Sequence, residues 1–290
     1  MSARKRRATP AASRPGKKDP ERTHRSETDS DYFVLFLKSR RAKGVSDGSV
    51  GYYEVKLRRF LLEVNVGDAR RPDIEDFLLQ FTNPGNRHAY YRAIKTFYNW
   101  REETFGTASP MKHMTAPRLG KLILPSLSRE QVLILIERAD NVRDKAIIAL
   151  FAESGLRLSE LANVQPQDID WTNSVIRVIG KGMKEDFAPF GKLTENLLRT
   201  WLDEYRPESN IWGLNEWGII SMLRRLEKAT GITCNPHTFR RTFACLLRKA
   251  GVDVMTIKDL GRWESLEMVQ RYTRSVTFTD SLKFYRPPLS

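Results

Sequence analysis

The chain has 290 residues, 40% of them hydrophobic, so it is long enough to form two domains that each bury a core, which excludes a single small module. Its formal net charge of +14 predicts attraction to a polyanion, and double-stranded DNA is the first candidate partner.

The two cysteines, Cys234 and Cys245, form no CxxC motif and belong to no Cys/His cluster. We therefore expect no disulfide framework, no metal site and no cofactor. The chain has no apolar run long enough to span a bilayer, and its N-terminus lacks the hydrophobic core of a signal peptide. These features predict a cytoplasmic protein that does not enter a membrane.

Residues 1–28 form a basic segment with Pro and Ser and almost no large apolar side chains. Nine of these residues are Lys or Arg and three are acidic, so the rest of the chain keeps a net charge of +8. Low hydrophobicity combined with high charge predicts a disordered tail. Such a tail can touch DNA phosphates or simply remain solvated.

Residues 29–107 show helical periodicity with little strand signal, which predicts a small all-helical domain. Its last helix should begin near Asn86, where cations alternate with aromatic residues as on a DNA-facing helix. We expect Arg87, Arg92 and Lys95 to bind DNA, although the basic face of a helix is often only solvated.

Residues 108–125 contain three prolines and Gly120 in a polar, basic stretch, which predicts an interdomain linker. The second domain is expected over residues 126–290. Ser128 and Gln131 form a capping box that predicts a helix beginning near Arg129. A second helix should run from about residue 143 to residue 154, because Gly155 is a typical helix terminator.

A β-hairpin is predicted where the apolar run at residues 175–179 leads into Gly180-Lys181-Gly182 and then into residues 186–190. Lys181 lies on its turn. The rest of the domain has apolar residues at helical spacing. The predicted fold class is therefore mainly α with a small antiparallel β-sheet: a helical domain followed by an α+β domain.

Four short motifs follow one another in the second domain. They are Gly155-Leu156-Arg157-Leu158-Ser159-Glu160-Leu161, Gly180-Lys181-Gly182, His237-Thr238-Phe239-Arg240 and Arg271-Tyr272-Thr273. In this order they resemble the tyrosine recombinase or phage integrase family, and in particular Xer-like site-specific recombinases. The resemblance covers the whole second domain, and the helical first domain is similar to that family's SAM-like core-binding domain.

The resemblance implies an enzyme that cleaves and rejoins DNA strands through a 3′-phosphotyrosyl intermediate, with Tyr272 as the nucleophile. Because a phosphotyrosyl bond conserves the energy of the broken strand, rejoining requires neither ATP nor a metal ion. Arg157 and Arg240 fit this chemistry, since a planar, permanently charged guanidinium holds two oxygens of a phosphate that gains negative charge during attack.

His237 lies three residues before Arg240, so both side chains share one helix face and can reach one phosphate. In the family the matching histidine donates a hydrogen bond to the phosphate and helps to deprotonate the tyrosine. Lys181, on a turn between two strands, matches the family's general acid for the leaving 5′ oxygen. Its neighbour Lys184 is expected to be a solvated turn residue.

Glu160 lies three residues after Arg157, close enough to orient it on a following helical turn, and it can equally be a surface acid. Arg241 is expected to be either a flanking surface residue or a residue that contacts the DNA backbone. The family often has Leu-Gly-His before the tyrosine, whereas this chain reads Leu260-Gly261-Arg262-Trp263. Counting back from the tyrosine places Trp263 at the histidine position, where an indole N–H can donate to phosphate. Counting forward from Gly261 selects Arg262.

The resemblance implies a clamp on duplex DNA that assembles as a tetrameric synapse, formed by this chain alone or together with a paralogous recombinase. Two other functions are compatible with a similar DNA clamp or similar chemistry. A non-catalytic DNA-binding regulator would not need the five residues Arg157, Lys181, His237, Arg240 and Tyr272. A type IB topoisomerase would relax supercoils as a monomer, without exchanging partners.

Overall fold

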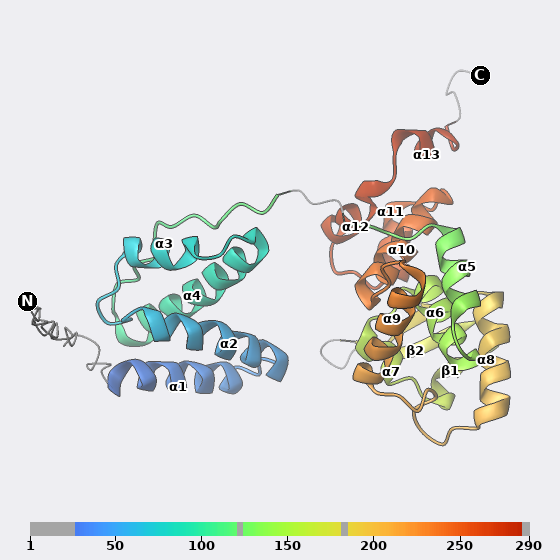
Figure 1. Ribbon diagram of the computed structural model, residues 1–290, viewed down its shortest axis with the longest axis horizontal. Helices are drawn as coiled ribbons and strands as arrows, with labels where there is room; N and C mark the ends of the chain where they lie inside the picture. The colour runs from blue at the N-terminus through green and yellow to red at the C-terminus, as the bar shows by residue number, and fades with distance from the viewer. Residues whose placement is uncertain (1–26, 121–123, 181–184, 286–290) are drawn as a thin grey trace, which may run out of the picture. The chain divides into compact units, whose positions relative to one another are not determined.

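The protein consists of two compact units, residues 1–122 and residues 123–290. A computed structural model describes residues 27–120, 124–180 and 185–285 (Figure 1). The first unit is helical, and the second combines helices with one three-stranded antiparallel sheet. The predicted fold class is confirmed. Within the described ranges, no helix combines the length and the apolar character needed to cross a membrane.

Four helices make up the first unit over the residues that the structure describes, 27–120. They are α1 (Glu27–Ala42), α2 (Asp47–Glu63), α3 (Arg71–Leu79) and α4 (Pro84–Phe105). The start of α4 is set locally, because the Asn83 side chain accepts a hydrogen bond from the Asn86 N–H and Pro84 fixes φ in the first turn. Gly106 ends the helix in the left-handed conformation, with φ +69°.

The core of the first unit is strongly aromatic. Phe36, Phe60 and Phe97 are fully buried and make edge-to-face contacts with neighbouring rings. Residues 108–117, expected as linker, extend this core, because Met111 and Met114 pack into it. The Tyr91 hydroxyl donates to the Met114 carbonyl oxygen at 2.6 Å. The helical unit therefore includes residues 108–117, which had been predicted to belong to the interdomain linker because of the proline and glycine content of residues 108–125.

The second unit is built from the elements that follow residue 128. Its helices are α5 (Arg129–Arg138), α6 (Val142–Ser154), α7 (Leu158–Ala162), α8 (Lys192–Tyr205), α9 (Glu216–Thr230), α10 (Pro236–Lys249), α11 (Val254–Leu260), α12 (Leu266–Tyr272) and α13 (Phe278–Leu282), with 3-10 turns at Pro166–Asp168 and Thr273–Ser275. Its strands are β1 (Ile169–Asp170), β2 (Val175–Ile179) and β3 (Glu185–Pro189), paired in the order β1-β2-β3.

The local signals in this unit act as predicted. Ser128 and Gln131 form the expected capping box at the start of α5. Gly155 ends α6 with φ +58°, and a Cβ there would lie 2.6 Å from the ring of Phe243. Only glycine meets both requirements, so the chain can turn sharply just before Arg157.

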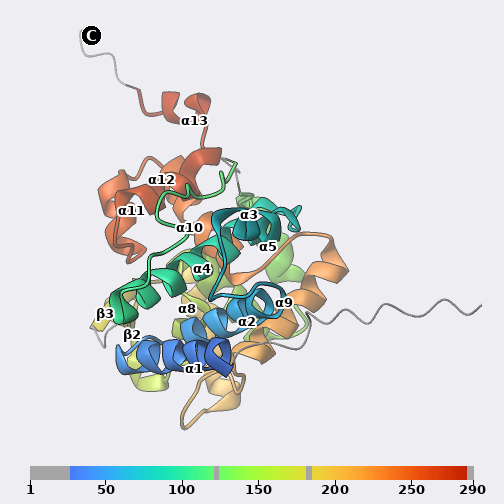
Figure 2. The same cartoon turned by 90° about the vertical axis from the view of Figure 1, so that its left-hand side faces the viewer.

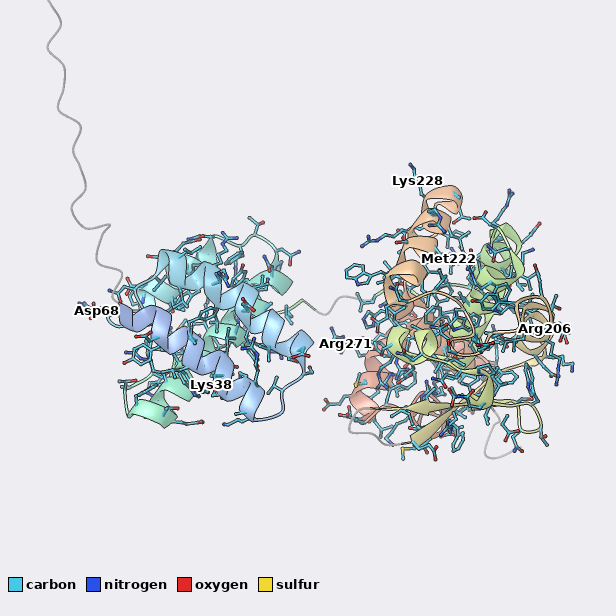
Figure 3. All side chains as sticks on the ribbon, turned by 90° about the horizontal axis from the view of Figure 1, so that it is seen from below. Lys38, Asp68, Arg206, Met222, Lys228 and Arg271 are labelled. Carbon is cyan, nitrogen blue, oxygen red and sulfur yellow. The ribbon has the colours of Figure 1, made fainter. Side chains whose placement is uncertain are left out.

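Two apolar clusters support the second unit, whose interior is filled with side chains (Figure 3). The larger is centred on α6, whose Ile147, Leu150 and Phe151 are fully buried. The smaller lies under α10, α11 and α12, which pack together (Figure 2). It contains Trp263 and partly buries Tyr272. Trp263 and Tyr272, two of the predicted site residues, are therefore supported by a small apolar cluster that is separate from the larger one.

Candidate active site

Arg157 lies at the N-terminus of α7, directly after the turn made by Gly155. Its backbone N–H donates to Glu160 Oε2 at 2.9 Å, and its Nη1 donates to Glu160 Oε1 at 2.5 Å. One carboxylate thus holds both the backbone and the side chain of Arg157. The arginine side chain remains 43% exposed, which leaves its guanidinium open to a ligand.

Glu160 is an almost completely buried acid, with 4% of its side chain exposed. Burial acts to raise the pKa of its carboxyl, but the Arg157 backbone N–H and the cations Arg262 and Arg157 outweigh burial and lower it. Glu160 is therefore an ionised anchor at neutral pH. The expectation that it orients Arg157 agrees with these contacts.

Arg240 projects from α10, which begins at Pro236 under an Asn235 cap. Its Nη1 donates to the Gly155 carbonyl oxygen and its Nη2 to that of Gly261, the latter at 2.5 Å. Only 4% of the residue is exposed. Burial, together with repulsion from Arg157 and Arg262, lowers the pKa of Arg240 to about 10.

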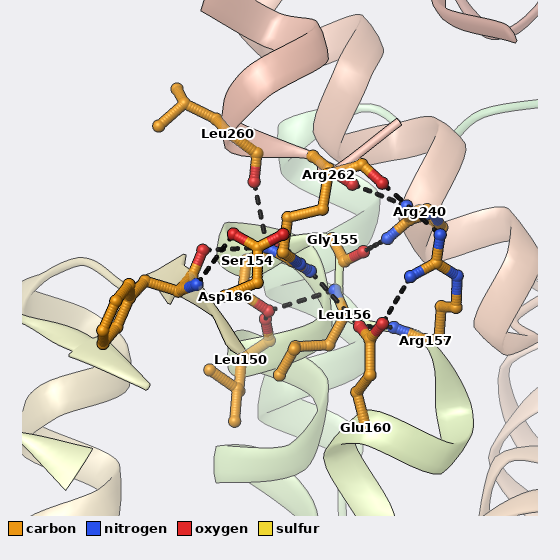
Figure 4. Close-up of polar contacts among 12 residues, drawn as sticks. Leu150, Ser154, Gly155, Leu156, Arg157, Glu160, Asp186, Arg240, Leu260 and Arg262 are labelled. Carbon is orange, nitrogen blue, oxygen red and sulfur yellow. Dashed lines mark hydrogen bonds and ion pairs between the residues drawn. The ribbon is translucent and has the colours of Figure 1, made fainter. Parts of the chain in front are cut away.

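The carboxylate of Glu160 contacts the guanidinium groups of Arg157 and Arg262, and the guanidinium of Arg240 lies close enough to interact with all three charges (Figure 4). Asp186 is a second carboxylate that acts on Arg262, so three cations face two anions and a local positive charge remains. Because part of the cluster is buried, this charge is poorly screened by water. The arrangement is suited to bind an anion and to stabilise additional negative charge on it.

The two candidates for the histidine position, Arg262 and Trp263, lie in the turn after α11, and their side chains have different surroundings. Arg262 turns inward, where its Nη2 lies 3.4 Å from Glu160 Oε2. The Trp263 ring instead packs on Tyr272, with centroids 5.6 Å apart, and under the guanidinium of Arg240 at 4.7 Å. The indole Nε1 is buried and has no hydrogen-bond partner among the described residues.

Tyr272 ends α12 and is half-buried. Its phenol is close enough to Arg240 and Arg241 to raise the pKa of both guanidiniums, against the larger lowering effect of burial. The Cys245 thiol donates to the Tyr272 carbonyl oxygen at 3.1 Å and so ties the end of α12 to α10. The tyrosine therefore lies beside the cation cluster on a fixed backbone.

His237 lies in the first turn of α10, one turn before Arg240, and is exposed at the surface. Partial burial of its ring lowers the imidazole pKa below 6.5, and the charges of Arg241 and Arg240 lower it further. The ring is therefore mostly neutral at neutral pH. No described residue is hydrogen-bonded to it, so both ring nitrogens are open to a ligand.

Lys181 lies outside the described residues, as does Lys184. The strands on either side are placed: β2 and β3 pair from Val175 opposite Pro189 to Ile179 opposite Glu185. The predicted hairpin is thus present up to Gly180, which borders the same pocket as Arg157.

Arg241 corrects one expectation. It is 8% exposed, its Nε donates to the Pro125 carbonyl oxygen at 2.9 Å, and its Nη2 donates to Thr238 Oγ1 at 2.8 Å. The expectation of a surface residue was wrong, because the Arg241 side chain is buried like that of Arg240 and is hydrogen-bonded to protein groups, whereas a contact with the DNA backbone stays a prediction. Its guanidinium fastens the segment before α5 to α10.

The three basic candidates on α4 differ in their surroundings. Arg87 donates twice to the Phe81 carbonyl oxygen, at 3.0 and 2.7 Å, and so closes the end of α3. Lys95 is partly buried and donates to the Tyr91 hydroxyl at 3.2 Å. Arg92 is exposed. Of the three, Arg92 is the most available to a phosphate.

The sequence interpretation missed the buried role of Arg262. It weighed this residue only as a substitute for the histidine, because nothing in a linear sequence shows which residue the guanidinium meets. Among the described residues, no group of three or more His, Cys, Asp or Glu side chains is arranged to hold a metal ion. The chemistry of the site comes from arginine, histidine, tryptophan and tyrosine side chains.

The family model of the phage integrase family matches residues 125–277. The chain is 30% identical over 199 residues to the tyrosine recombinase XerC of Staphylococcus epidermidis, a match that covers 62% of this chain and 67% of the relative. It is 27% identical over 266 residues to the tyrosine recombinase XerA of Saccharolobus solfataricus, covering 85% and 89%.

The fold is shared with solved structures. A crystal structure of a lambda integrase dimer bound to a COC′ core site matches with a TM-score of 0.72 at 14% identity, covering 86% of this chain and 78% of that one. At this identity the likeness concerns the fold alone.

Proposed function

The chain belongs to the phage integrase family and is a tyrosine-type site-specific DNA recombinase, and we propose that Tyr272 is its nucleophile. The observation that carries this assignment is the position of the Tyr272 ring, which lies against Trp263 beside the buried cation Arg240. A phenol next to a fixed positive charge is favourably placed to attack an anionic phosphate.

The phosphate would sit between Arg157 and Arg240. Both guanidiniums are held by protein groups on one side: Arg157 by Glu160, and Arg240 by the carbonyl oxygens of Gly155 and Gly261. Because these contacts fix the two cations before DNA binds, little reorganisation is needed as charge builds on the phosphate. Burial, and after it repulsion from Arg157, lowers the pKa of Arg240, and the bound anion would relieve this repulsion.

Trp263 and His237 would complete the ring of donors. The Trp263 Nε1–H has no partner among the described residues, so it is free to donate to a phosphate oxygen. Of the two candidates for the histidine position, Trp263 is favoured over Arg262 because it contacts both Arg240 and Tyr272. His237, mostly neutral at neutral pH, can accept a proton from the attacking phenol or donate to the phosphate.

In the proposed step the Tyr272 oxygen attacks phosphorus, the bond to the 5′ oxygen breaks, and a 3′-phosphotyrosyl bond forms. The phenolic proton passes to a base, and the leaving 5′ oxygen takes a proton from a general acid, for which we propose Lys181. Reversal with a different 5′ hydroxyl rejoins the strand. No bond energy is lost, so ATP is not consumed.

Assembly is the second part of the proposal: four protomers, of this chain alone or of this chain and a paralogous recombinase, exchange strands between two duplexes. Support comes from apolar residues near the C-terminus. Phe278 is 79% exposed, Leu282 50% and Tyr285 57%, and the three side chains line one pocket, so they form a shared apolar surface of the kind that marks an interaction site. Mass measurement of the DNA-bound protein tests this part: a tetramer on two duplexes is expected, whereas a monomer that relaxes plasmids would favour the topoisomerase alternative.

The test of the nucleophile uses a nicked duplex that traps the covalent intermediate. Its target sequence is first selected from a randomised DNA pool by binding. Wild-type protein should give a covalent band on a denaturing gel, and Tyr272→Phe should bind the same duplex without forming one. A persistent band in the variant would assign the attack to another residue. No band with wild-type protein on a bound duplex would favour the non-catalytic regulator.

A further inference from the structure

Arg262 has a backbone conformation that normally belongs to glycine. Its φ is +55°, in the left-handed region, where the Cβ of other residues is crowded. The residue is also bulky, charged and buried, with only 3% of its side chain exposed. A strained and buried arginine is retained most readily when its side chain has a task that glycine cannot perform.

The side chain of Arg262 meets four separate segments of the second unit. Its Nη1 donates to the carbonyl oxygens of Leu260 at 2.9 Å and Phe187 at 3.4 Å. Its Nη2 donates to the Ser154 carbonyl oxygen at 3.5 Å and to Glu160 at 3.4 Å (Figure 4). The ends of α6 and α11, the first turn of α7 and strand β3 are therefore joined through one guanidinium.

Two of these links lead to the phosphate-binding arginines. Glu160, which receives Arg262, is also the carboxylate that holds Arg157. In addition, the Arg262 carbonyl oxygen accepts a hydrogen bond from Arg157 Nη2 at 3.4 Å, and the preceding Gly261 carbonyl accepts one from Arg240. The conformation of this single turn thus sets the orientation of both arginines.

We propose that Arg262 is a positioning residue that fixes Arg157 and Arg240 and fastens the β2–β3 hairpin to them; this inference rests on the proposed function. We place Arg262 outside the phosphate site because only 3% of its side chain is exposed and its two terminal nitrogens donate to four protein oxygens; its buried Nε has no partner among the described residues. Arg262 keeps the two arginines in a reactive geometry before DNA binds, so the entropy loss of ordering them occurs during folding and not during DNA binding. Through the Phe187 carbonyl oxygen it also links strand β3 to the same site.

The primary test is Arg262→Gly, which keeps the left-handed backbone and removes the side chain. The matched control is Arg206→Gly, because Arg206 also has a positive φ, +47°, but lies exposed at the end of α8 (Figure 3). Adduct formation is measured in a single turnover with saturating nicked duplex. A misplaced site should slow Arg262→Gly by about 10- to 100-fold. Duplex affinity should stay within about twofold, since the exposed cations remain. Arg206→Gly should match wild type.

A double-mutant cycle separates positioning from a general structural effect. If Arg262 acts through Glu160, the combination of Arg262→Gly with Glu160→Gln should be no slower than the slower single variant. Losses that multiply would overturn the proposal. So would an Arg262→Gly variant that cleaves at the wild-type rate, or one that loses duplex affinity and rate equally, as expected of a phosphate ligand.

Arg262→Lys keeps the test decisive if the glycine variant fails to fold. Lysine retains the charge beside Glu160 but cannot reach Leu260 and Phe187 at once as a planar group does. It should fold and cleave more slowly than wild type, and a wild-type rate would overturn the proposal. The proposed function and this inference are contradicted by different results. If the wild-type protein forms no Tyr272-dependent adduct, the proposed function is wrong. If the wild-type protein is active and the Arg262 variants are equally active, only this inference is wrong.

Discussion

The guanidinium carbon of Arg240 lies 4.7 Å from the centroid of the Trp263 indole, over the face of the ring. This contact stabilises the buried cation by a cation–π interaction and leaves the indole edge, with its N–H, without a partner among the described residues. Because a buried donor that lacks a partner is costly in the free protein, bound phosphate is expected to satisfy it.

Replacing Trp263 by Phe should slow cleavage while leaving the fold intact. The ring that supports Arg240 and Tyr272 is kept, and only the Nε1–H is lost. A hydrogen bond to a charged group contributes about 1.5–3 kcal/mol, so the rate should fall roughly 10- to 100-fold. Single-turnover adduct formation measures this. Trp217→Phe, at a tryptophan that is 72% exposed, is the control, and equal rates in both variants would contradict the role of the indole.

The imidazole of His237 should titrate below pH 6.5, because burial and then Arg241 and Arg240 lower its pKa. Cleavage that depends on neutral His237 should therefore persist through pH 6.5 and fall only at more acidic pH. Since the unfolded chain binds this proton more readily, the fold also loses stability as pH falls below 6.5. NMR titration of the ring gives the pKa, and His237→Gln should lack the acidic limb of the rate profile. An imidazole pKa at or above 6.5 would refute the assignment.

Arg240→Lys should impair both stability and chemistry. Lysine is a point charge that cannot serve the carbonyl oxygens of Gly155 and Gly261 together, so one buried acceptor is left unpaired at a cost of about 1–3 kcal/mol. The cleavage rate should fall by about 100-fold or more, with a far smaller loss of DNA affinity. Thermal unfolding and single-turnover assays separate the two effects. Arg248→Lys on the same helix is the control, and a parallel loss of affinity and rate would make Arg240 a binding residue only.

Glu160→Gln should destabilise the protein most clearly at neutral pH. The lowered pKa of this carboxyl means that its contribution to stability is complete above pH 4.5 and is lost as pH falls through the lower pKa of the folded state. Removing the buried charge leaves Arg262 without its anion, at a cost of about 3 kcal/mol. Denaturant unfolding at pH 7 and at pH 3.5 should show the variant converging on wild type in acid.

The control for Glu160 is Glu54→Gln, which breaks an exposed ion pair with Arg58. Exposed pairs contribute little, so this variant should unfold almost as wild type does at both pH values. A Glu160→Gln variant that is as stable as Glu54→Gln at pH 7 would show that Glu160 is not the buried anchor of the arginine cluster.

The sequence by itself determined the features that depend on neighbours along the chain. The capping box of Ser128 and Gln131, the turn at Gly155 and the helical phase that puts His237 one turn before Arg240 are set by local backbone geometry. The order of the motifs was enough to predict the family by resemblance, and the residue types they contain suit the chemistry of phosphate transfer. Fold class follows from apolar periodicity for the same local reason.

Only the tertiary structure decided which residues meet across long stretches of chain. Arg262 finds Ser154, Glu160 and Phe187 from segments far away in the sequence, and no local pattern encodes that convergence. Arg241 differs from its neighbour Arg240 only in helix phase relative to a core that the sequence does not show. These contacts depend on packing between distant elements. Burial there makes a charged side chain, which the sequence alone would place in solvent, part of the structural framework.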